Sequence, residues 1–375
     1  MTDYYVRPGG GSDAAAGTSY ALAKATLQAA VNLMSPGDRV IACADAEEEI
    51  SSQVSWAITS TTTAPSQIIG ANSSGVIDGT RYVLKPSVSF TGSMLLAPGI
   101  TTGHHMHIRY IEANCNANTV QVNYGLGAWS SGGTGQYINI IKCHAYGAAQ
   151  SGIYFRNESR PMIAGCVCYD NDVHGISLGA SGGFTIGGEA YGNLCYNNGV
   201  DGIRTHDQLH RLINNICVHN DSSGIYFWGP QANICTIFGN TLCDNGGDGV
   251  EFASTTANVF AIYLHNNTIC NNGGYGVNDG AGGSNFTDQQ INALHNHFYG
   301  NTSNPTSLGA TLPDFESIDG DPLFTDSVNM DYTLQSGSPL VGAGMNGSTI
   351  GALGLASAGG GGGGGGVLIG GRLVR

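Results

Sequence analysis

The chain has 375 residues, of which 59 are glycine and only 11% are charged. An average domain has roughly 7% glycine and about 25% charged residues. The excess of glycine argues against a helical fold, because each glycine inside a helix costs about 1 kcal/mol relative to alanine. Hydrophobic residues make up 41% of the chain, which is enough for a large core and argues against disorder. The composition therefore indicates a folded, turn-rich β protein.

The net charge is −14, from 13 basic and 27 acidic residues. Such a chain repels phosphate backbones and anionic lipids, so neither nucleic acid nor a membrane surface is an expected partner. No run of 18 apolar residues is present, and the first residues lack the charged and apolar regions of a signal peptide. We therefore expect neither a membrane span nor a signal peptide.

The first elements expected along the chain are a strand at residues 4–6, a helix over residues 18–33 and a turn and strand over residues 36–43. The helix segment is rich in Ala and Leu and starts with Thr and Ser, which accept hydrogen bonds at helix N-termini. A stack of strands with an open end exposes core and unpaired edges, so we expect this helix to cap the N-terminal end. Residues 44–136 show weaker periodicity and are expected to form irregular early coils.

Seven cysteines recur along the chain with gaps of 22 to 28 residues, at Cys115, Cys143, Cys168, Cys195, Cys217, Cys243 and Cys270. From Cys143 onward, six units share an apolar segment with Cys, a polar Asn/Gly turn, a Gly and an alternating strand. This period is typical of a parallel β-helix, because each coil buries side chains inward and stacks on the next about 4.8 Å away. We expect each cysteine to occupy the same place in its coil.

Asparagines lie at or near the turn of successive units, at Asn171, Asn198, Asn220, Asn245 and Asn272. Asn tolerates left-handed backbone and can bond to a stacked neighbour, so these residues predict a ladder. The cysteines are expected to be buried free thiols, because parallel Cβ vectors in adjacent coils disfavour the disulfide dihedral. A linear column of thiols also lacks the tetrahedral arrangement of a metal site. Free thiols without a signal peptide favour folding in a cytosol.

The end of the chain predicts a closing segment over residues 320–344, and eight consecutive glycines at 359–366 indicate a flexible tether. The sequence thus predicts four parts. They are an N-terminal strand and helix cap at 1–66, β-helix coils at 67–300, C-terminal coils and cap at 301–358, and a Gly-rich tail at 359–375.

Three features together resemble the right-handed parallel β-helix superfamily of pectate-lyase-like proteins, over roughly residues 4–354. They are the Tyr-Tyr-Val opening with a helix leading to Pro-Gly-Asp, the Gly-Ile and Gly-Val coils, and the closing segment that starts Gly-Asp-Pro-Leu-Phe at residue 320. The resemblance implies an all-β right-handed parallel β-helix. It implies less about activity, because the superfamily includes lyases, hydrolases, esterases, phage tailspikes and non-catalytic modules.

The Gly-rich tail looks like those of some bacteriophage virion proteins, and trimers are common among tailspikes of similar fold. The resemblance therefore implies a homotrimer or a virion assembly, found in the virion or outside the cell after lysis.

A candidate binding face follows from the strand after each repeat Gly, where residues between the inward-facing positions point outward. One outward column contains Tyr154, Ser177, Arg204, Tyr226, Glu251 and Asn278. The second contains Arg156, Gly179, His206, Trp228, Ala253 and Gly280. Aromatic platforms beside charged hydrogen-bonding groups are typical of a sugar-binding groove, so polysaccharide is the expected partner. The alternative is an ordinary solvated face with aromatic ladders.

Two kinds of catalysis are open for this face. A lyase that cleaves a uronate must neutralise the substrate carboxylate, a role for Arg204, and remove an α-proton, a role for His206 or Tyr226. A hydrolase needs two carboxyl groups, for which Asp248, Glu251 and Asp201 are the candidates. Substrate contacts are expected from Tyr154, Arg156, Trp228 and Asn278.

Related lyases use Arg or Lys as the base and Ca²⁺ on clustered carboxylates, but the sequence shows no clear acidic cluster for calcium. No cofactor or metal is therefore expected. The paired-Asp and Gly-His-Gly signatures of polygalacturonase-like hydrolases are also missing. Two functions remain open: a polysaccharide lyase or glycoside hydrolase similar to tailspikes, and a non-catalytic virion structural or receptor-binding protein anchored through its Gly-rich tail.

Overall fold

The computed structural model describes most of the chain in segments. They are residues 1–56, 58, 60–61, 64–98, 105–116, 120–129, 137–156, 160–179, 187–206, 210–228, 234–253, 261–279, 291–303, 317–352, 367–369 and 372–374. The chain divides into two units, Met1–Gly188 and Glu189–Arg375.

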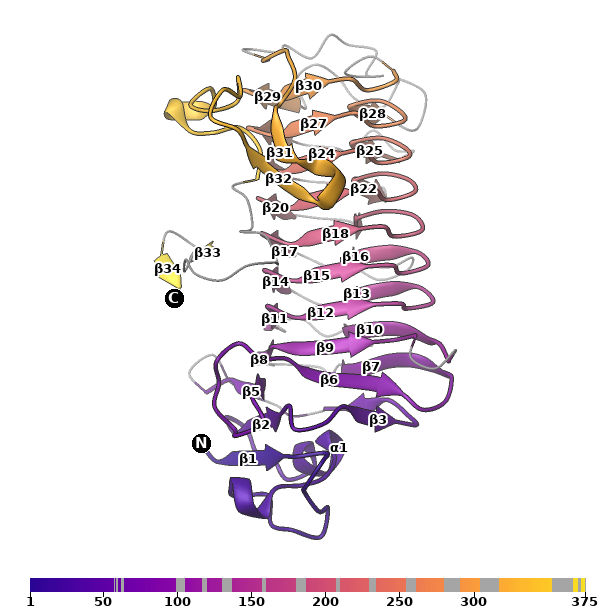
Figure 1. The fold of residues 1–375 in the computed structure, drawn as a ribbon, viewed down its shortest axis with the longest axis vertical. Helices are drawn as coiled ribbons and strands as arrows, with labels where there is room; N and C mark the ends of the chain where they lie inside the picture. The colour runs from indigo at the N-terminus through magenta and orange to yellow at the C-terminus, as the bar shows by residue number, and fades with distance from the viewer. Residues whose placement is uncertain are drawn as a thin grey trace. The chain divides into compact units, whose positions relative to one another are not determined.

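Unit 1 is a stack of coils, each of which contributes one strand to each of three parallel sheets (Figure 1). Sheet A contains β1 (Asp3–Val6), β2 (Arg39–Cys43), β5 (Ser66–Ala71), β8 (His105–Arg109), β11 (Tyr137–Ile141) and β14 (Met162–Ala164). Sheet B contains β3 (Glu48–Ile50), β6 (Tyr82–Pro86), β9 (Ile111–Asn114), β12 (His144–Tyr146) and β15 (Val167–Tyr169). Sheet C contains β4 (Val54–Ser55), β7 (Phe90–Pro98), β10 (Val122–Trp129), β13 (Ser151–Arg156) and β16 (His174–Leu178).

Unit 2 repeats this arrangement. Its sheet A strands are β17 (Glu189–Tyr191), β20 (Arg211–Ile213), β23 (Ile234–Phe238), β26 (Ala261–His265) and β29 (Ile291–Leu294). Its sheet B strands are β18 (Leu194–Tyr196), β21 (Ile216–Val218), β24 (Thr241–Cys243), β27 (Thr268–Cys270) and β30 (His297–Tyr299). Its sheet C strands are β19 (Ile203–His206), β22 (Ile225–Trp228), β25 (Val250–Phe252) and β28 (Val277–Asp279). The expected all-β parallel β-helix is confirmed.

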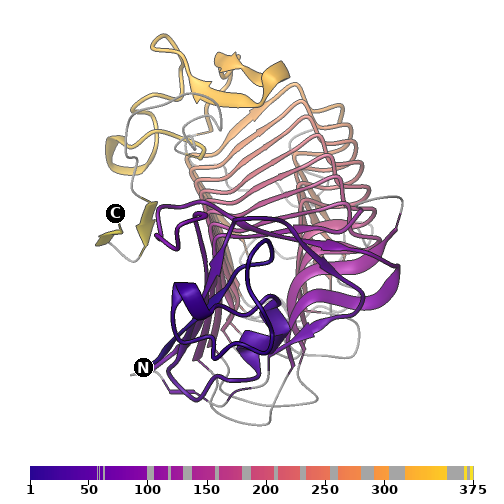
Figure 2. The ribbon, with the colours of Figure 1, turned by 60° about the horizontal axis from the view of Figure 1, so that its bottom comes forward.

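The core of each unit lies between its three sheets, where alternate residues of every strand point inward (Figure 2). In unit 2, Phe227 and Phe252 are buried on adjacent coils and their rings stack with centroids 4.9 Å apart. Residues between the inward positions face outward, so the alternation fixes which side chains each sheet presents. The coils of residues 44–136, expected to be irregular, supply strands to the same three sheets, with a register shift between β7 and β10 at Val122 and Tyr124.

From β8 onward, each turn from sheet A to sheet B contains a single residue with left-handed backbone. Gly192 fills this position in one coil of unit 2, and Asn214 fills it in the next, with φ of 58° and 55°. From β12 onward, a second left-handed residue follows each sheet B strand, for example Asn197 with φ of 53° and Asp244 with φ of 58°. Gly and Asn adopt this backbone at low cost, which explains their enrichment at these turns.

The predicted asparagine ladder is confirmed in unit 2. The Oδ1 of Asn220 accepts hydrogen bonds from the backbone N–H and Nδ2 of Asn198, at 3.2 and 2.9 Å. Asn245 binds Asn220 in the same way, and Asn272 binds Asn245. In unit 1, Asn171 bonds to the neighbouring coil through Ala148 N–H at 3.1 Å.

A second ladder, which sequence analysis missed, follows the turn from sheet A to sheet B. It runs through Asn193, Asn215, Asn240, Asn267 and Asn296. In both ladders, each asparagine directly follows a residue with left-handed backbone. The ladder asparagines named above are almost fully buried. Buried amides of this kind must be hydrogen-bonded, and the ladders satisfy them coil by coil.

The expectation that every cysteine occupies one position in the coil is wrong. Cys195 pairs in register with Cys217, but Cys217 pairs with Leu242, and Cys243 pairs with Val218. In unit 1, Cys168 pairs with Ala145 rather than with a cysteine. Cys243 and Cys270 therefore occupy strand positions of the opposite parity from Cys217, and they pack outside the three-sheet core with Ile216, Val218 and Tyr332.

Cys243 and Cys270 form a disulfide, which corrects the prediction that all cysteines are free thiols. They are register partners on β24 and β27 with Cα atoms 4.6 Å apart, so adjacent coils bring the two side chains close enough for a bridge. The other eight cysteines are buried. The bridge lies against the C-terminal hairpin of β31 (Phe324–Asp326) and β32 (Asp331–Leu334), which confirms a closing segment in this region.

Reduction of the disulfide is expected to destabilise unit 2 by roughly 3 kcal/mol, because the bridge closes a loop with a sequence separation of 27 residues. The measurement is a thermal melt with and without a phosphine reductant. The Cys270→Ala variant is the control, since the reductant should leave its melting temperature unchanged. An equal shift in both proteins would contradict the prediction.

The predicted helix over residues 18–33 is largely wrong. The structure has a 3-10 turn at Tyr20–Leu22 and a short helix, α1 (Leu27–Val31). Between them Lys24 behaves as a strand residue: its N–H donates to the Tyr5 carbonyl and its carbonyl accepts from Arg7 N–H, both at 2.8 Å. Pairing with the strand at residues 3–6 therefore interrupts the helical segment.

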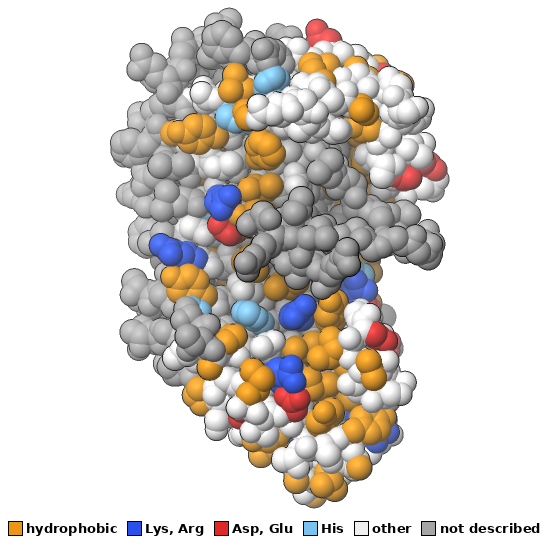
Figure 3. Space-filling model, turned by 90° about the vertical axis from the view of Figure 1, so that its left-hand side faces the viewer, with side chains coloured by type: hydrophobic (Ala, Val, Ile, Leu, Met, Phe, Trp, Pro, Cys, Tyr) orange, Lys and Arg blue, Asp and Glu red, His pale blue; other side chains and the backbone are white. Residues whose placement is uncertain are grey.

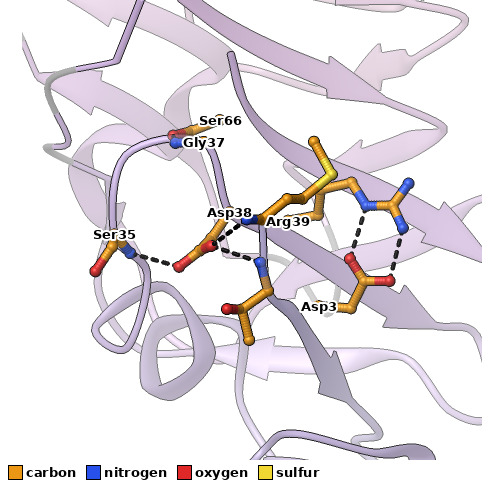
Figure 4. A network of polar contacts seen from close by, with 8 residues as sticks. Asp3, Ser35, Gly37, Asp38, Arg39 and Ser66 are labelled. Atoms are coloured by element: carbon orange, nitrogen blue, oxygen red, sulfur yellow. Dashed lines mark hydrogen bonds and ion pairs between the residues drawn. The ribbon is translucent and has the colours of Figure 1, made fainter. Parts of the chain in front are cut away.

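The predicted strands at residues 4–6 and in 36–43 are confirmed as β1 and β2. The Asp38 carboxylate fixes the turn before β2 by accepting from Ser35 N–H at 2.9 Å and from Thr2 N–H at 2.6 Å (Figure 4). Arg39 then binds Asp3 through two hydrogen bonds, of 2.7 and 2.6 Å. This bidentate pair joins β1 to β2.

Glu48 is a buried carboxyl group between α1 and sheet B. It accepts hydrogen bonds from Leu27 N–H and from the Tyr82 hydroxyl, and only 4% of its surface is exposed. Burial raises the pKa of Glu48 from 4.5 to about 7, although both hydrogen bonds favour the charged form. The folded protein therefore holds this proton more tightly than the unfolded chain does.

We expect the stability that Glu48 provides to be fully present below pH 4.5 and to be lost as the pH rises to about 7. The free energy of unfolding, taken as wild type minus Glu48→Gln, should fall by about 3 kcal/mol across this range. Denaturant titrations at several pH values measure it. Glu47→Gln, at an exposed carboxylate, serves as the control with no such slope. If this difference in the free energy of unfolding instead rises with pH, the folded state lowers the pKa of Glu48.

No helix among the described residues is long and apolar enough to cross a membrane. The Gly-rich run at 359–366 lies outside the described residues. After it, β33 (Val367–Ile369) and β34 (Arg372–Val374) pair antiparallel.

Candidate functional site

The outward column predicted for unit 2 is present on sheet C. In-register pairing of β19, β22, β25 and β28 places Arg204 next to Tyr226, Tyr226 next to Glu251, and Glu251 next to Asn278. All four side chains are half-buried. A cation, a phenol, a carboxyl group and an amide therefore stand on successive coils, about 4.8 Å apart.

The second column pairs His206 with Trp228. Trp228 is half-buried, and its ring lies 4.6 Å from the His206 ring and 5.2 Å from the Arg204 guanidinium carbon. The Trp ring thus receives a cation–π contact that orients Arg204. We call Arg204, Tyr226, Trp228 and Glu251 the sheet C site.

The expectation that His206 is an exposed outward residue is wrong, because only 6% of its surface is exposed. The neighbouring Trp228 ring packs against it, and its carbonyl group contacts Nε2 of the buried His210 at 3.1 Å. This burial favours a packing role for His206 over proton transfer with a substrate.

Glu251 is the carboxyl group of the site with the most unusual environment. Burial raises its pKa above the usual 4.5, and the nearby charges of Asp248 and Asp201 raise it further. The Ser223 hydroxyl donates to Oε2 at 2.8 Å and opposes this shift. A carboxyl group whose pKa moves toward neutrality is suited to proton transfer.

Asp248 and Asp201 lie nearby but are engaged by the protein itself. Asp248 accepts from Tyr275 N–H and from the Asn278 amide, both at 2.6 Å, and Asp201 accepts from Ser223 N–H at 3.1 Å. Their exposed fractions are only 7% and 2%. They therefore fix the turns before the sheet C strands and bias Glu251 by charge.

Tyr226 stands between Arg204 and Glu251. Burial raises its pKa, and the charges of Glu251 and Asp201 raise it further, whereas Arg204 lowers it. Tyr226 therefore keeps its proton at neutral pH and can donate it.

Tyr154 and Arg156, also predicted to contact substrate, lie on β13 in unit 1. Tyr154 stacks on Tyr124 with ring centroids 4.2 Å apart, and Arg156 is the register partner of Trp129. Tyr124 was missed by sequence analysis. The sequence does carry a signal for Tyr124, because the next two residues are Gly and Leu126, as in the Gly-Ile motif. Leu126 pairs in register with Ile153 of that motif.

Among the residues that the structure describes, no three His, Cys, Asp or Glu side chains gather to hold a metal ion.

Comparison with known proteins supports the fold. The family model of the right handed beta helix region matches residues 99–234, and no curated protein sequence matches the chain. Pectate lyase Pel9A is similar in structure with a TM-score of 0.65 and 16% identity, over 94% of this chain and 96% of that one.

Two further solved structures are similar. The A-module of the Azotobacter vinelandii mannuronan C-5 epimerase AlgE4 has a TM-score of 0.54 and 17% identity, over 84% of this chain and 86% of that one. ORF18 of Geobacillus virus E2 has a TM-score of 0.53 and 13% identity, over 78% of this chain and 56% of that one. The chain thus has the right-handed parallel β-helix fold of pectate-lyase-like proteins, as its sequence motifs predicted.

Proposed function

We propose that the chain is a carbohydrate-active β-helix protein that cleaves an acidic polysaccharide at the sheet C site by β-elimination. The observation that carries this proposal is the column of Arg204, Tyr226 and Glu251 on three adjacent coils. It offers a cation for the substrate carboxylate, a protonated phenol and a carboxyl group with a raised pKa.

The reaction assigns one role to each residue. Arg204 pairs with the uronate carboxylate and withdraws charge as the adjacent carbon becomes acidic. Glu251 takes the proton from that carbon, the electron pair forms a carbon–carbon double bond, and the bond to the glycosidic oxygen breaks. Tyr226 donates its proton to the departing oxygen, and Trp228 offers a flat apolar surface to a sugar ring.

Hydrolysis is less well supported. It needs two carboxyl groups that both reach the scissile bond or its water. Asp201 and Asp248, the predicted partners of Glu251, are buried and hydrogen-bonded to the protein. Two of the proteins of similar fold are named for pectate and mannuronan, which supports an acidic substrate.

The test is incubation of the purified protein with a panel of acidic and bacterial surface polysaccharides. Ultraviolet absorbance of unsaturated uronates and the formation of new reducing ends are both followed. Both signals together are expected. New reducing ends without absorbance would indicate hydrolysis, and silence of the folded protein across the panel would overturn the enzymatic proposal.

A second candidate function is that of a non-catalytic virion component that binds glycan or a partner subunit. The similar fold of a viral protein, ORF18, favours it. Under this proposal, deletion of residues 359–375 changes the oligomer mass, for example from trimer to monomer, and leaves glycan binding unchanged. Light scattering of both forms distinguishes the outcomes.

A further inference from the structure

Sheet A of unit 1 presents a second surface, remote in sequence from the sheet C site. On β8, Met106 and Ile108 are buried, so His105, His107 and Arg109 face outward. On β11, Tyr137 and Asn139 are their register partners. Figure 3 shows Lys, Arg and His side chains among hydrophobic ones on the side where sheet A lies.

Arg109 and Lys142 lie around Tyr110 at one end of these strands, and Arg160 lies against Tyr137 at the other end. The Arg109 guanidinium lies 5.6 Å from the Tyr110 ring centroid, and the Lys142 ammonium lies 6.0 Å from the same ring. Arg160 lies 5.9 Å from the Tyr137 ring and donates to its hydroxyl at 3.3 Å. We call these five residues the basic face.

The three cations of the basic face differ from four other basic residues of the chain. Arg7, Arg39, Lys85 and Arg211 each pair with a carboxylate. Within the described residues, no carboxylate lies within ion-pair distance of Arg109, Lys142 or Arg160, and the buried Nε of Arg109 has no hydrogen-bond partner.

The acidic groups near the basic face are already engaged. Glu112, two residues after Tyr110, accepts from the Tyr146 hydroxyl at 3.1 Å and lies 3.7 Å from His144. Asp78 is held by Asn72 and Thr80. Cations without a carboxylate partner among the described residues, in a chain of net charge −14, fit an anionic ligand.

The remaining side chains fit a sugar polymer. The His105 and Tyr137 rings stack face to face on adjacent strands, with centroids 4.6 Å apart and planes within 9° of parallel, so the pair presents its ring edges. Next to it, His107 Nε2 and the Asn139 amide lie 3.2 Å apart and present neutral hydrogen-bonding groups. Burial lowers the pKa of His107, and Arg109 and His105 lower it further, so the ring is uncharged at neutral pH.

We infer that the basic face is a second binding site, made of other residues than the sheet C site, that holds a carboxylate-bearing polysaccharide chain. The cations bind the uronate carboxylates, and the edges of the stacked His105 and Tyr137 rings contact a sugar. The inference takes its polymer class from the proposed function, but it does not require cleavage.

The test measures binding of polygalacturonate to the full-length Arg204→Ala/Glu251→Gln variant, which lacks turnover and the cation of the sheet C site. The double variant Lys142→Gln/Arg160→Gln should bind about 10-fold more weakly at low ionic strength and show a smaller salt dependence. The matched control is Lys85→Gln/Arg211→Gln, which removes the same charge from cations already paired with carboxylates. It should change binding less than twofold.

Three results would overturn the inference: equal weakening in the control, equal affinity for neutral dextran, or equal affinity for a DNA oligomer. Tyr137→Ala should also weaken polygalacturonate binding. Unchanged affinity would show that the His105 and Tyr137 rings do not contact the sugar. Failure of the proposed function appears separately, as absent cleavage by the protein with an intact Glu251. The binding isotherms measure binding at the basic face whether or not the protein cleaves the polysaccharide.

Discussion

Replacement of Glu251 by glutamine is expected to lower kcat on a cleaved polysaccharide by about 10²- to 10⁴-fold, with little change in the melting temperature. Glutamine keeps the shape and can still accept from the Ser223 hydroxyl, but it cannot take a proton. Arg204→Ala should also abolish turnover and leave the protein folded, since its side chain is half-buried on the outer face. Initial rates and thermal melts of the variants provide the measurement.

The pH profile tests the role of Glu251 separately. As a base it works only when ionised, so kcat/KM should rise with pH through a value above the usual 4.5 of a glutamate. Ser223→Ala removes a hydrogen bond that favours the ionised form, so the rising limb should move to higher pH. A rate that instead falls through this pKa would assign Glu251 the role of an acid. Loss of folding in Glu251→Gln would refute the outward placement.

The Asn245→Ala variant is expected to lose about 4 kcal/mol of stability in unit 2. The Asn245 amide oxygen accepts from Asn220 N–H and Nδ2, and its Nδ2 donates to the Cys217 carbonyl at 3.0 Å. Removal leaves these buried groups unpaired, and each costs about 1–3 kcal/mol. Denaturant-induced unfolding followed by circular dichroism measures the loss.

Asn301→Ala provides the matched control for this prediction. Asn301 makes the same contacts to Asn272 and to the Ile269 carbonyl, but it is half-buried at the end of the ladder. Water can satisfy the groups that it leaves, so the loss should be less than half that of Asn245→Ala. Equal losses would show that the ladder stabilises through backbone geometry instead of buried hydrogen bonds.

The sequence predicted the repeat and one ladder because both depend on local pattern. Strand alternation placed Arg204, Tyr226 and Glu251 on one face without knowledge of the core. The register of the cysteines could not be predicted in this way. The sequence separation between two cysteines also includes the residues that connect sheet C to sheet A, and their number differs from coil to coil. The 26 residues from Cys217 to Cys243 thus hide a shift of one position, which Leu242 reveals.

The burial of individual site residues also lay beyond the sequence. His206, Asp201 and Asp248 are buried by contacts with Trp228 and with turns of adjacent coils, and such contacts have no signal in the spacing of one coil. The prediction of a helix over residues 18–33 was wrong for a similar reason. Its Ala and Leu content favours a helix, but pairing of Lys24 with β1 overrides that local preference.

The paired left-handed corners also determine where the chain can change length. In unit 2, two residues always separate a sheet A strand from the sheet B strand, and six separate sheet B from sheet C. The connection from sheet C back to sheet A grows along the unit, from four residues after β19 to eleven after β28. The differences in length between the coils of unit 2 therefore fall in the connections from sheet C to sheet A. This fold can acquire new specificity there without altering its ladders, which makes those connections the natural place for grafted loops.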